Sequence, residues 1–395
     1  MKHVAWIVVL FAAIPAWSAP ARKITVQELK DLLIAQQTAG KNDDEVAVQL
    51  KQVELTEELT PAAKDGLSSY VPGKNTTEQL FALEARSALL PPPAADIPTA
   101  PAPDPAAQQA LLAKATTYVG TYLSHLPALT ASKSTARFQD QVEGVHADTS
   151  MHTQQSGNGD ILRDQSSAYV RLVSLKTDTV EIDSGAEKIP DFKGKGPWGA
   201  NGIVASVGAP LTVTTLLQEV QANGSPKFLR WETVNGKQAA VFSFAVDKKK
   251  THYGINYCCF PDVDPGSSMN YGMGKGAPPP PSGKDNLQPD ADYRPFKASA
   301  GYHGELFLDP DTGAIVRTIT QAEFKGGDYV RSEGVRTDFA RAPIGDKSLV
   351  VPERSYTLAT VVSNGDTSTV KFPLRHTFVS QTYKSYQLAN ATAQN

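Results

Sequence analysis

The stretch from Tyr302 to Arg317, YHGELFLDPDTGAIVR, decides the fold of this chain. Two runs of strand-forming residues flank the segment DPDTG at 309–313. Pro310 fixes φ at the first turn position, and Gly313 can adopt the positive φ that closes a hairpin. The pattern predicts two antiparallel strands joined by a tight turn, and it gives the long C-terminal half the character of antiparallel sheet.

Strand patterns with a period of two extend outward from this hairpin. Roughly ten strands are expected beyond residue 134, and the pair Asn235-Gly236 predicts a second tight hairpin. The run Leu306-Phe307-Leu308 is apolar on both faces, which favours a sheet that is covered on both sides. A helix is expected over 210–221. We therefore predict an α+β fold, in which an N-terminal helical region precedes a large, curved, half-barrel-like antiparallel sheet with an inserted helix.

The N-terminal region, 19–90, has a helical period and predicts four short amphipathic helices. Thr25 and Glu28 form a capping-box pattern, and Asn42 or Asp43 can cap a second helix. Thr60-Pro61 is typical of an N-cap followed by proline at the first helical position, and Thr76 or Thr77 is expected to open the fourth helix.

Low-complexity segments divide the remaining chain. Residues 91–105 carry seven prolines and predict a semi-rigid linker. The β-rich domain is expected to span 106–387 and to begin with a helix. Within it, the proline-rich stretch 274–290 is interpreted as a disordered surface loop. A short tail follows at 388–395.

The first 18 residues resemble a secretory signal. A short basic start is followed by an apolar run from Val4 to Trp17, and small residues precede the preferred cleavage point after Ser18. The run is too short for a membrane span, and no other stretch approaches ~20 apolar residues. The mature chain is expected to be exported to the periplasm or the extracellular space, without a transmembrane segment.

The charge balance argues against some partners. The net charge of the 395-residue chain is −3, and removal of Lys2 with the signal makes it about −4. This gives no electrostatic case for binding nucleic acid or an anionic membrane.

Cys258 and Cys259 are the two cysteines of the chain, and they are adjacent. In a regular strand they point to opposite faces, so a bond between them requires a distorted peptide. An oxidising compartment nevertheless favours disulfides. Three readings stay open: separate thiols with Cys259 in the core, a vicinal disulfide at a strained strand end, and an intermolecular or redox role.

His303 is the weak candidate for a catalytic residue, because Glu305 shares its strand face. A hydrogen-bonded strand histidine is the simpler reading. His146 and His152 lie in an expected loop with loose metal-ligand spacing, for which solvation is the simpler reading. The chain contains no metalloprotease, nucleophile-elbow or phosphate-loop motif. We expect no cofactor and no metal site.

Three long runs carry a family resemblance: HYGINYCCF from 252, YRPFKASAGYHGELFLDPDTGAIVRTITQAEFKGGDYVRSEG from 293, and IGDKSLVVPERS from 344. Together with ITVQELKDLL from 24, they resemble a family of exported acidobacterial proteins without an assigned function. The resemblance covers nearly the whole mature chain, and it implies no catalytic residue. The insertion at 274–290 departs from the family pattern.

The expected sheet is also similar, in architecture alone, to the half-open barrels of lipoprotein carriers, which hold an acyl chain between sheet and helices. This likeness implies an envelope protein that binds a hydrophobic or lipid-like ligand without catalysis. The alternative is a structural module of the cell envelope that contacts a partner protein through its N-terminal helices. A hydrolase built around a histidine is the third hypothesis.

Overall fold

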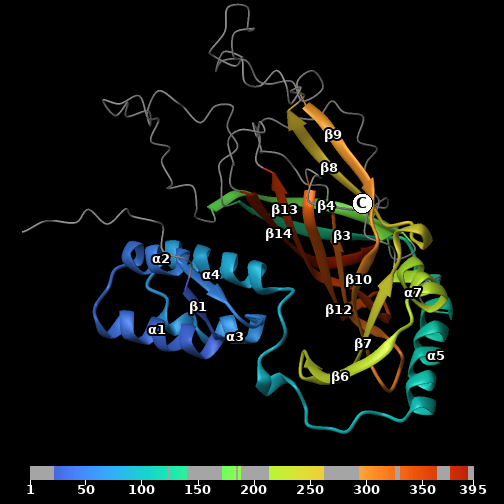
Figure 1. Cartoon of the computed structure of the whole chain (residues 1–395). Helices are drawn as coiled ribbons and strands as arrows, with labels where there is room; N and C mark the ends of the chain where they lie inside the picture. Colours follow the sequence, from blue (N-terminus) through green and yellow to red (C-terminus); the bar gives the residue numbers. More distant parts are fainter. Residues whose placement is uncertain are drawn as a thin grey trace, which may run out of the picture.

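The computed structural model describes residues 22–121, 125–139, 171–183, 186–187, 213–261, 293–324, 330–362 and 374–389. An N-terminal unit of residues 22–90 packs against a large curved sheet that carries two further helices (Figure 1). The predicted α+β class is therefore confirmed. The expected signal, the loop at 274–290 and most of the tail lie outside the described residues.

The N-terminal unit combines four helices with a small parallel sheet that the sequence patterns did not indicate. Its elements are β1 (Arg22–Ile24), α1 (Val26–Thr38), α2 (Asp43–Lys51), β2 (Val53–Leu55), α3 (Pro61–Gly66), η1 (Ser68–Tyr70) and α4 (Lys74–Ser87). β1 and β2 pair in parallel. Apolar side chains from all four helices and both strands form one core.

The helix starts follow the capping signals with one exception. Thr25 and Asn42 both form complete capping boxes, and Thr60 caps α3 ahead of Pro61. The fourth helix begins at Lys74, before the expected threonines. There the carboxylate of Asp43, on α2, accepts the backbone N–H groups of Asn75 and Thr76 at 2.8 Å each. The cap of α4 thus comes from another helix, which a local pattern cannot reveal.

The main sheet has ten strands, all paired antiparallel, in the order β5-β4-β3-β14-β13-β12-β11-β10-β7-β6. Its strands are β3 (Leu129–Gln139), β4 (Arg171–Asp183), β5 (Ala186–Glu187), β6 (Lys227–Val234), β7 (Lys237–Val246), β10 (Tyr302–Leu308), β11 (Ile315–Glu323), β12 (Val330–Ile344), β13 (Lys347–Val362) and β14 (Leu374–Leu388). β5, which has two residues, forms one edge of the sheet, and β6 forms the other. The sheet therefore stays open. The early strand β3 pairs with β14, the last strand among the described residues.

A separate antiparallel pair, β8 (Gly254–Pro261) and β9 (Tyr293–Ser299), flanks the segment that contains the predicted loop 274–290. The chain therefore leaves along one strand of this pair and returns along the other. The insertion of a loop within one domain stays a prediction.

The hairpin of β10 and β11, which we call the central hairpin after its place in the 302–317 segment, forms as predicted. The turn between β10 and β11 is closed by the carboxylate of Asp309, which accepts the backbone N–H groups of Asp311 and Thr312. Gly313 has φ +74°. A Cβ atom at this position would lie 2.5 Å from the carbonyl carbon of Lys114, on helix α5 (Pro105–Thr121). Glycine is needed here both for its backbone conformation and for the close approach of the helix.

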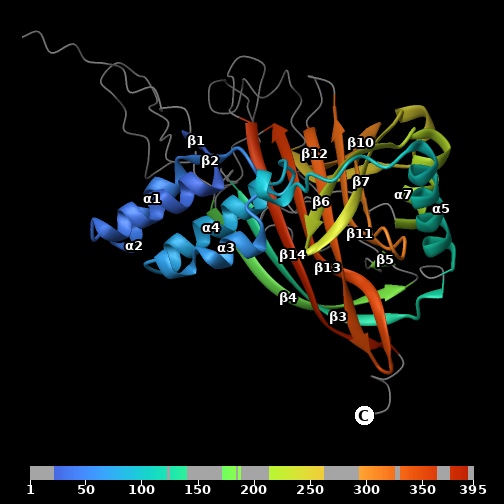
Figure 2. The same cartoon turned by 90° about the horizontal axis from the view of Figure 1, so that it is seen from below.

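The two faces of the sheet are covered by different elements (Figure 2). Helices α5 and α7 (Val213–Asn223) lie on the face that we call the inner face. One apolar core there joins side chains of β3 and β4 with side chains of β7 and β10, which are distant in strand order. The sheet therefore curves around these helices. The N-terminal unit covers the opposite face, the outer face, where the apolar contacts form two separate clusters.

The central hairpin contributes to both faces. Leu306 and Leu308 belong to the inner core, whereas Phe307 belongs to an outer cluster, and all three are fully buried. The prediction of a sheet covered on both sides is confirmed at this strand.

The proline-rich segment 91–105 is hydrogen-bonded to the N-terminal unit at its start and to β6 near its end. It contains a short 3₁₀ turn, η2 (Ala94–Asp96), and runs past β6 to the start of α5 (Figure 1). The backbone N–H of Glu58 donates to Pro91 O at 2.9 Å, and the indole N–H of Trp231, on β6, donates to Pro101 O at 2.8 Å. These bonds fix the path of the segment between the two units.

Candidate functional site

In the described part of the chain, His303 and its neighbour Glu305 do not form a catalytic pair. His303 is exposed on the outer face of β10. The Glu305 carboxylate beside it accepts two hydrogen bonds from the guanidinium of Arg230, at 3.0 and 2.8 Å. Its oxygens are thus engaged by a cation from a neighbouring part of the sheet. His146 and His152 lie outside the described residues.

Cys258 and Cys259 lie at an irregularity of the β8–β9 pair. The register is Tyr257 opposite Phe296, and it resumes at Phe260 opposite Arg294. The two cysteines therefore lie within a register shift of this pair. The three readings of these thiols stay predictions.

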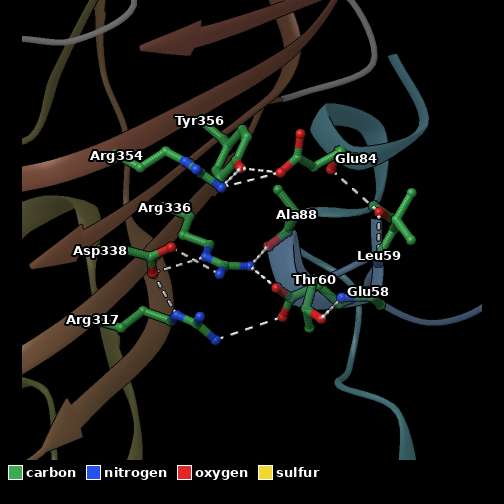
Figure 3. A network of polar contacts seen from close by, with 12 residues as sticks. Glu58, Leu59, Thr60, Glu84, Ala88, Arg317, Arg336, Asp338, Arg354 and Tyr356 are labelled. Carbon is green, nitrogen blue, oxygen red and sulfur yellow. Dashed lines mark hydrogen bonds and ion pairs between the residues drawn. The ribbon is translucent and has the colours of Figure 1, made fainter. Parts of the chain in front are cut away.

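The densest cluster of charges joins the N-terminal unit to the outer face of the sheet (Figure 3). At its centre, the side chain of Arg336 on β12 is 1% exposed. Its guanidinium donates to both carboxylate oxygens of Asp338, at 3.0 and 2.9 Å, and to the backbone oxygen of Ala88 at 3.2 Å. An ion pair of 2.5 Å connects it to Glu58, which follows β2.

A second arginine, Arg317 on β11, shares the same carboxylates. It donates to Asp338 at 2.6 Å and to Glu232 at 3.2 Å, and its Nη1 lies 3.5 Å from Glu58 Oε2. Its guanidinium also lies over the ring of Phe307, 5.2 Å from the centroid. Glu58 is thus held between two arginines that belong to adjacent strands.

A third contact group lies beside these two. Glu84, on α4, accepts hydrogen bonds from Arg354 at 3.1 Å and from the hydroxyl of Tyr356 at 3.0 Å. It also forms a short ion pair with Lys64, on α3. Both arms of the cluster therefore connect acidic residues of the N-terminal unit with arginines of the sheet.

The electrostatics of this cluster favour a structural role. Burial alone would raise the pKa of Asp338, but the neighbouring guanidinium groups of Arg336 and Arg317 lower it to about 2. The central charges are paired with one another and have almost no contact with solvent. They leave no group free to meet a substrate. We interpret the cluster as the attachment of the N-terminal unit to the sheet.

The inner face has a different character over β11, β12, β13, β14 and β3. The strand register places two cross-strand rows there that are rich in hydroxyl groups. The first row is Thr320, Val335, Thr357, Val379 and Arg137, and the second is Thr318, Thr337, Ser355, Gln381 and Thr135. This part of the inner face is amphiphilic, in contrast to the apolar core beneath α5 and α7.

Buried and half-buried positions occur on both faces of these strands. On the inner face, Val335, Thr357, Val379 and Arg137 are all half-buried. Their outer-face neighbours along the strands are buried: Arg336, Tyr356, Phe378 and Phe138. The inner surface of β12, β13, β14 and β3 combines half-buried aliphatic side chains with hydroxyl groups and Arg137, and we take it as the candidate binding surface.

One edge of this surface is formed by a cluster of tyrosines and glutamates. Glu219 on α7 accepts hydrogen bonds from the backbone N–H of His252 at 2.8 Å and from the hydroxyl of Tyr302 at 2.9 Å. The ring of Tyr302 stacks on that of Tyr253, with centroids 5.0 Å apart. The hydroxyl of Tyr253 then donates to Glu333 Oε2 at 2.7 Å.

Glu333 is the unusual member of this cluster. It projects from β12 into the inner face, where its cross-strand partners are Ala322 and Ala359, and it is 2% exposed. Its second oxygen, Oε1, accepts no hydrogen bond from the described residues. Burial raises the pKa of Glu333 to about 7, although the bond from Tyr253 acts in the opposite direction.

The comparisons with known proteins return no match: no family model, no curated protein and no solved structure is significantly similar to this chain. The function of this chain is therefore inferred from its own residues. Within the described ranges, no helix is long and apolar enough to span a membrane. The same ranges contain no group of three or more side chains suited to hold a metal ion.

Sequence reasoning singled out His303 and the cysteines and missed the groups that the fold brings together. One sequence feature could have indicated the charge cluster. In Arg336-Thr337-Asp338, the residues that point to either face of the strand are polar. Such a strand inside a large sheet requires partners for its charges, but the sequence does not say which.

Proposed function

We propose that this chain is an exported binding protein that holds an amphiphilic, lipid-like ligand on the inner face of its sheet, without catalysing a reaction. The observation that carries the proposal is the set of half-buried aliphatic, hydroxyl and guanidinium side chains on the inner face of β12, β13, β14 and β3, namely Val335, Thr357, Val379 and Arg137. The N-terminal unit covers the opposite face around Arg336 and Tyr356.

The composition of the inner face favours an amphiphile over a purely apolar ligand. Half-buried apolar side chains such as Phe339 and Tyr383 border the apolar core beneath α5 and α7. Towards β3 the inner face carries the hydroxyl rows and Arg137. A ligand with an apolar chain and a polar end would match both regions, because each part would lie against groups of its own kind.

The test is to measure ligand binding by the mature chain, residues 19–395. The purified protein is extracted with organic solvent and the extract is analysed by lipid mass spectrometry, and uptake of a fluorescent fatty acid is titrated in parallel. We expect either a co-purified amphiphile or saturable uptake. A protein that is free of lipid and takes up no probe would overturn the proposal.

Two matched tryptophan variants locate the binding surface. Val379→Trp places an indole among the half-buried residues of the inner face, and we expect it to reduce uptake at least tenfold. Leu175→Trp places the same group on β4 at a position that is 70% exposed, and it should leave uptake unchanged. Equal uptake by both variants would contradict the assignment to the inner face.

The alternative function is an envelope module that contacts a partner protein through its N-terminal helices. Because the side of the N-terminal unit that carries Glu58 and Glu84 is occupied by the sheet, a partner would bind elsewhere on the unit. Val48 on α2 is a large apolar side chain that is 49% exposed there. Affinity capture from envelope extracts with the full chain and with Val48→Asp tests this idea, and capture of the same partner by both would contradict it.

A further inference from the structure

The buried carboxyl of Glu333 has one oxygen engaged and one without a partner. Oε2 accepts the hydroxyl of Tyr253, whereas Oε1 has no hydrogen bond from the described residues. A buried acceptor without a partner is destabilising and rare in folded proteins, so each instance calls for an explanation. A bound polar group that supplies the missing hydrogen bond would explain this one.

The carboxyl lies at the border of the candidate binding surface. The next residue on the same face of β12 is Val335, which is half-buried, as is Thr357 on the adjacent strand. On either side of Glu333 the cross-strand neighbours are alanines, Ala322 and Ala359. Because both neighbours are small, a ligand that enters from the half-buried part of the face would meet the carboxyl and not a larger side chain.

The surroundings of Glu333 are polar. None of the described contacts brings a cation to its Oε1 atom. Its one described bond comes from Tyr253, whose hydroxyl also lies 3.5 Å from Thr320 Oγ1. The other carboxylate of the cluster, Glu219, already accepts hydrogen bonds from Thr251, His252 and Tyr302. A carboxylate head group would meet an acid here with no compensating positive charge, whereas a hydroxyl or an amide N–H would meet an acceptor.

We propose that Glu333 Oε1 anchors the uncharged, hydrogen-bond-donating end of the bound amphiphile, an alcohol or an amide. This inference rests on the proposed function and adds the chemical class of the ligand's polar end. The stacked pair of Tyr253 and Tyr302, tied to α7 through Glu219, holds the carboxyl in place. The raised pKa of Glu333 supports the assignment, because a partly neutral acid is compatible with a neutral ligand group.

The experiment compares two fluorescent probes that share one chain and differ only at the polar end: a pyrene-labelled fatty alcohol and its methyl ether. We expect the unmodified mature chain to bind the alcohol about tenfold more tightly than the ether, because the ether lacks the donor. Glu333→Leu should remove this preference. Glu333→Gln, which keeps an acceptor oxygen, should retain most of it.

The outcomes separate the two proposals. If the unmodified chain binds neither probe nor the fluorescent fatty acid, the proposed function fails. If it binds alcohol and ether equally, or if Glu333→Leu keeps the preference for the alcohol, the role of Glu333 is overturned while the proposed function stands. Thermal melts of both variants verify folding, and Glu333→Gln supplies the comparison if Glu333→Leu does not fold.

Discussion

Arg336 shows how a single residue determines the stability of the interface between the two units. Its side chain is almost completely removed from water, and Asp338 and Glu58 supply the opposing charges. Removing one partner of such a group leaves a buried charge without compensation, which is far more destabilising than the loss of a surface pair. The attachment of the N-terminal unit therefore depends on Glu58 as well as on its apolar contacts.

Substitution Glu58→Leu should lower the free energy of unfolding by about 3–5 kcal/mol, because Arg336 and Arg317 both lose a buried partner. Urea denaturation followed by far-ultraviolet circular dichroism measures the change. Glu45→Gln, at a surface ion pair with Lys41, is the control and should have little effect. An equally small effect of Glu58→Leu would refute the role given to this carboxylate.

The pKa of Glu333 predicts a dependence of stability on pH. Its ordinary value is 4.5 and burial raises it to about 7 in the folded chain. Below pH 4.5 both states hold the proton; between 4.5 and 7 the unfolded state alone releases it. The contribution of Glu333 therefore falls as pH rises through this window, by about 3 kcal/mol in total.

The measurement is the free energy of unfolding at pH 5 and pH 8 for the unmodified chain and for Glu333→Gln. The variant lacks the titrating group, so its stability should decline less between these values. Asp338 does not interfere, because its lowered pKa of about 2 places its effect below pH 4. Parallel pH profiles for the two proteins would contradict the assignment.

At the scale of secondary-structure elements, the central hairpin is fixed by its contact with α5. The turn at 309–313 lies against the backbone of Lys114, whose ammonium group also donates to Pro310 O at 2.9 Å. The turn thus connects the middle of the sheet with the helix that covers the inner face. Its position is set by tertiary packing as well as by turn chemistry.

Gly313→Ala should be more destabilising than Gly345→Ala, in the turn between β12 and β13. Both glycines have positive φ, +74° and +62°, but no atom lies within 4 Å of a Cβ built at Gly345. The Gly345 variant should lose about 1 kcal/mol from backbone strain, and the Gly313 variant should lose about 1–3 kcal/mol more from the clash with α5. Equal midpoints in urea would show that the helix does not press on the turn.

Local signals predicted the elements well where the deciding partners are close in sequence. The capping boxes at Thr25 and Asn42 and the turn at Asn235-Gly236, with φ of 50° and 75°, depend on residues at most three positions apart. The start of α4 depends on Asp43, on another helix, and was misplaced for that reason. Propensity and spacing carry no information about a cap supplied from a distance.

At the scale of the whole molecule, the charge cluster couples the N-terminal unit to the sheet. Unfolding the unit alone would expose Glu58 and Glu84 but would leave Arg336 without one of its two acidic partners. Partial unfolding is therefore strongly disfavoured. The segment 91–105, bonded to Trp231, adds a second connection between the two parts.

We expect the mature chain to unfold in one calorimetric transition, with equal calorimetric and van't Hoff enthalpies. Glu58→Leu should separate this transition into two, the first from the N-terminal unit. Differential scanning calorimetry of both proteins is the measurement. Two transitions in the unmodified chain would mean that the units are thermodynamically independent.

The candidate site could not be predicted from sequence for a reason that also belongs to this scale. Glu333, Tyr253 and Glu219 come from three separate segments and meet because the sheet curves around α7. Their individual positions in strands and loops look unremarkable in the chain. The curvature, and with it the identity of the neighbours, depends on the pairing of ten strands.

The pairing of β3 with β14 has a consequence for the order of events during synthesis. Phe138 and Phe378 face each other across two strands that lie more than half of the chain apart. Until β14 has left the ribosome, β3 and β4 cannot join the rest of the sheet. During that time one edge of β3 is open to pairing with other chains. The same geometry lets β14 of one copy complete the sheet of another, so the exchange of this strand is the expected route to dimers and aggregates when folding is interrupted.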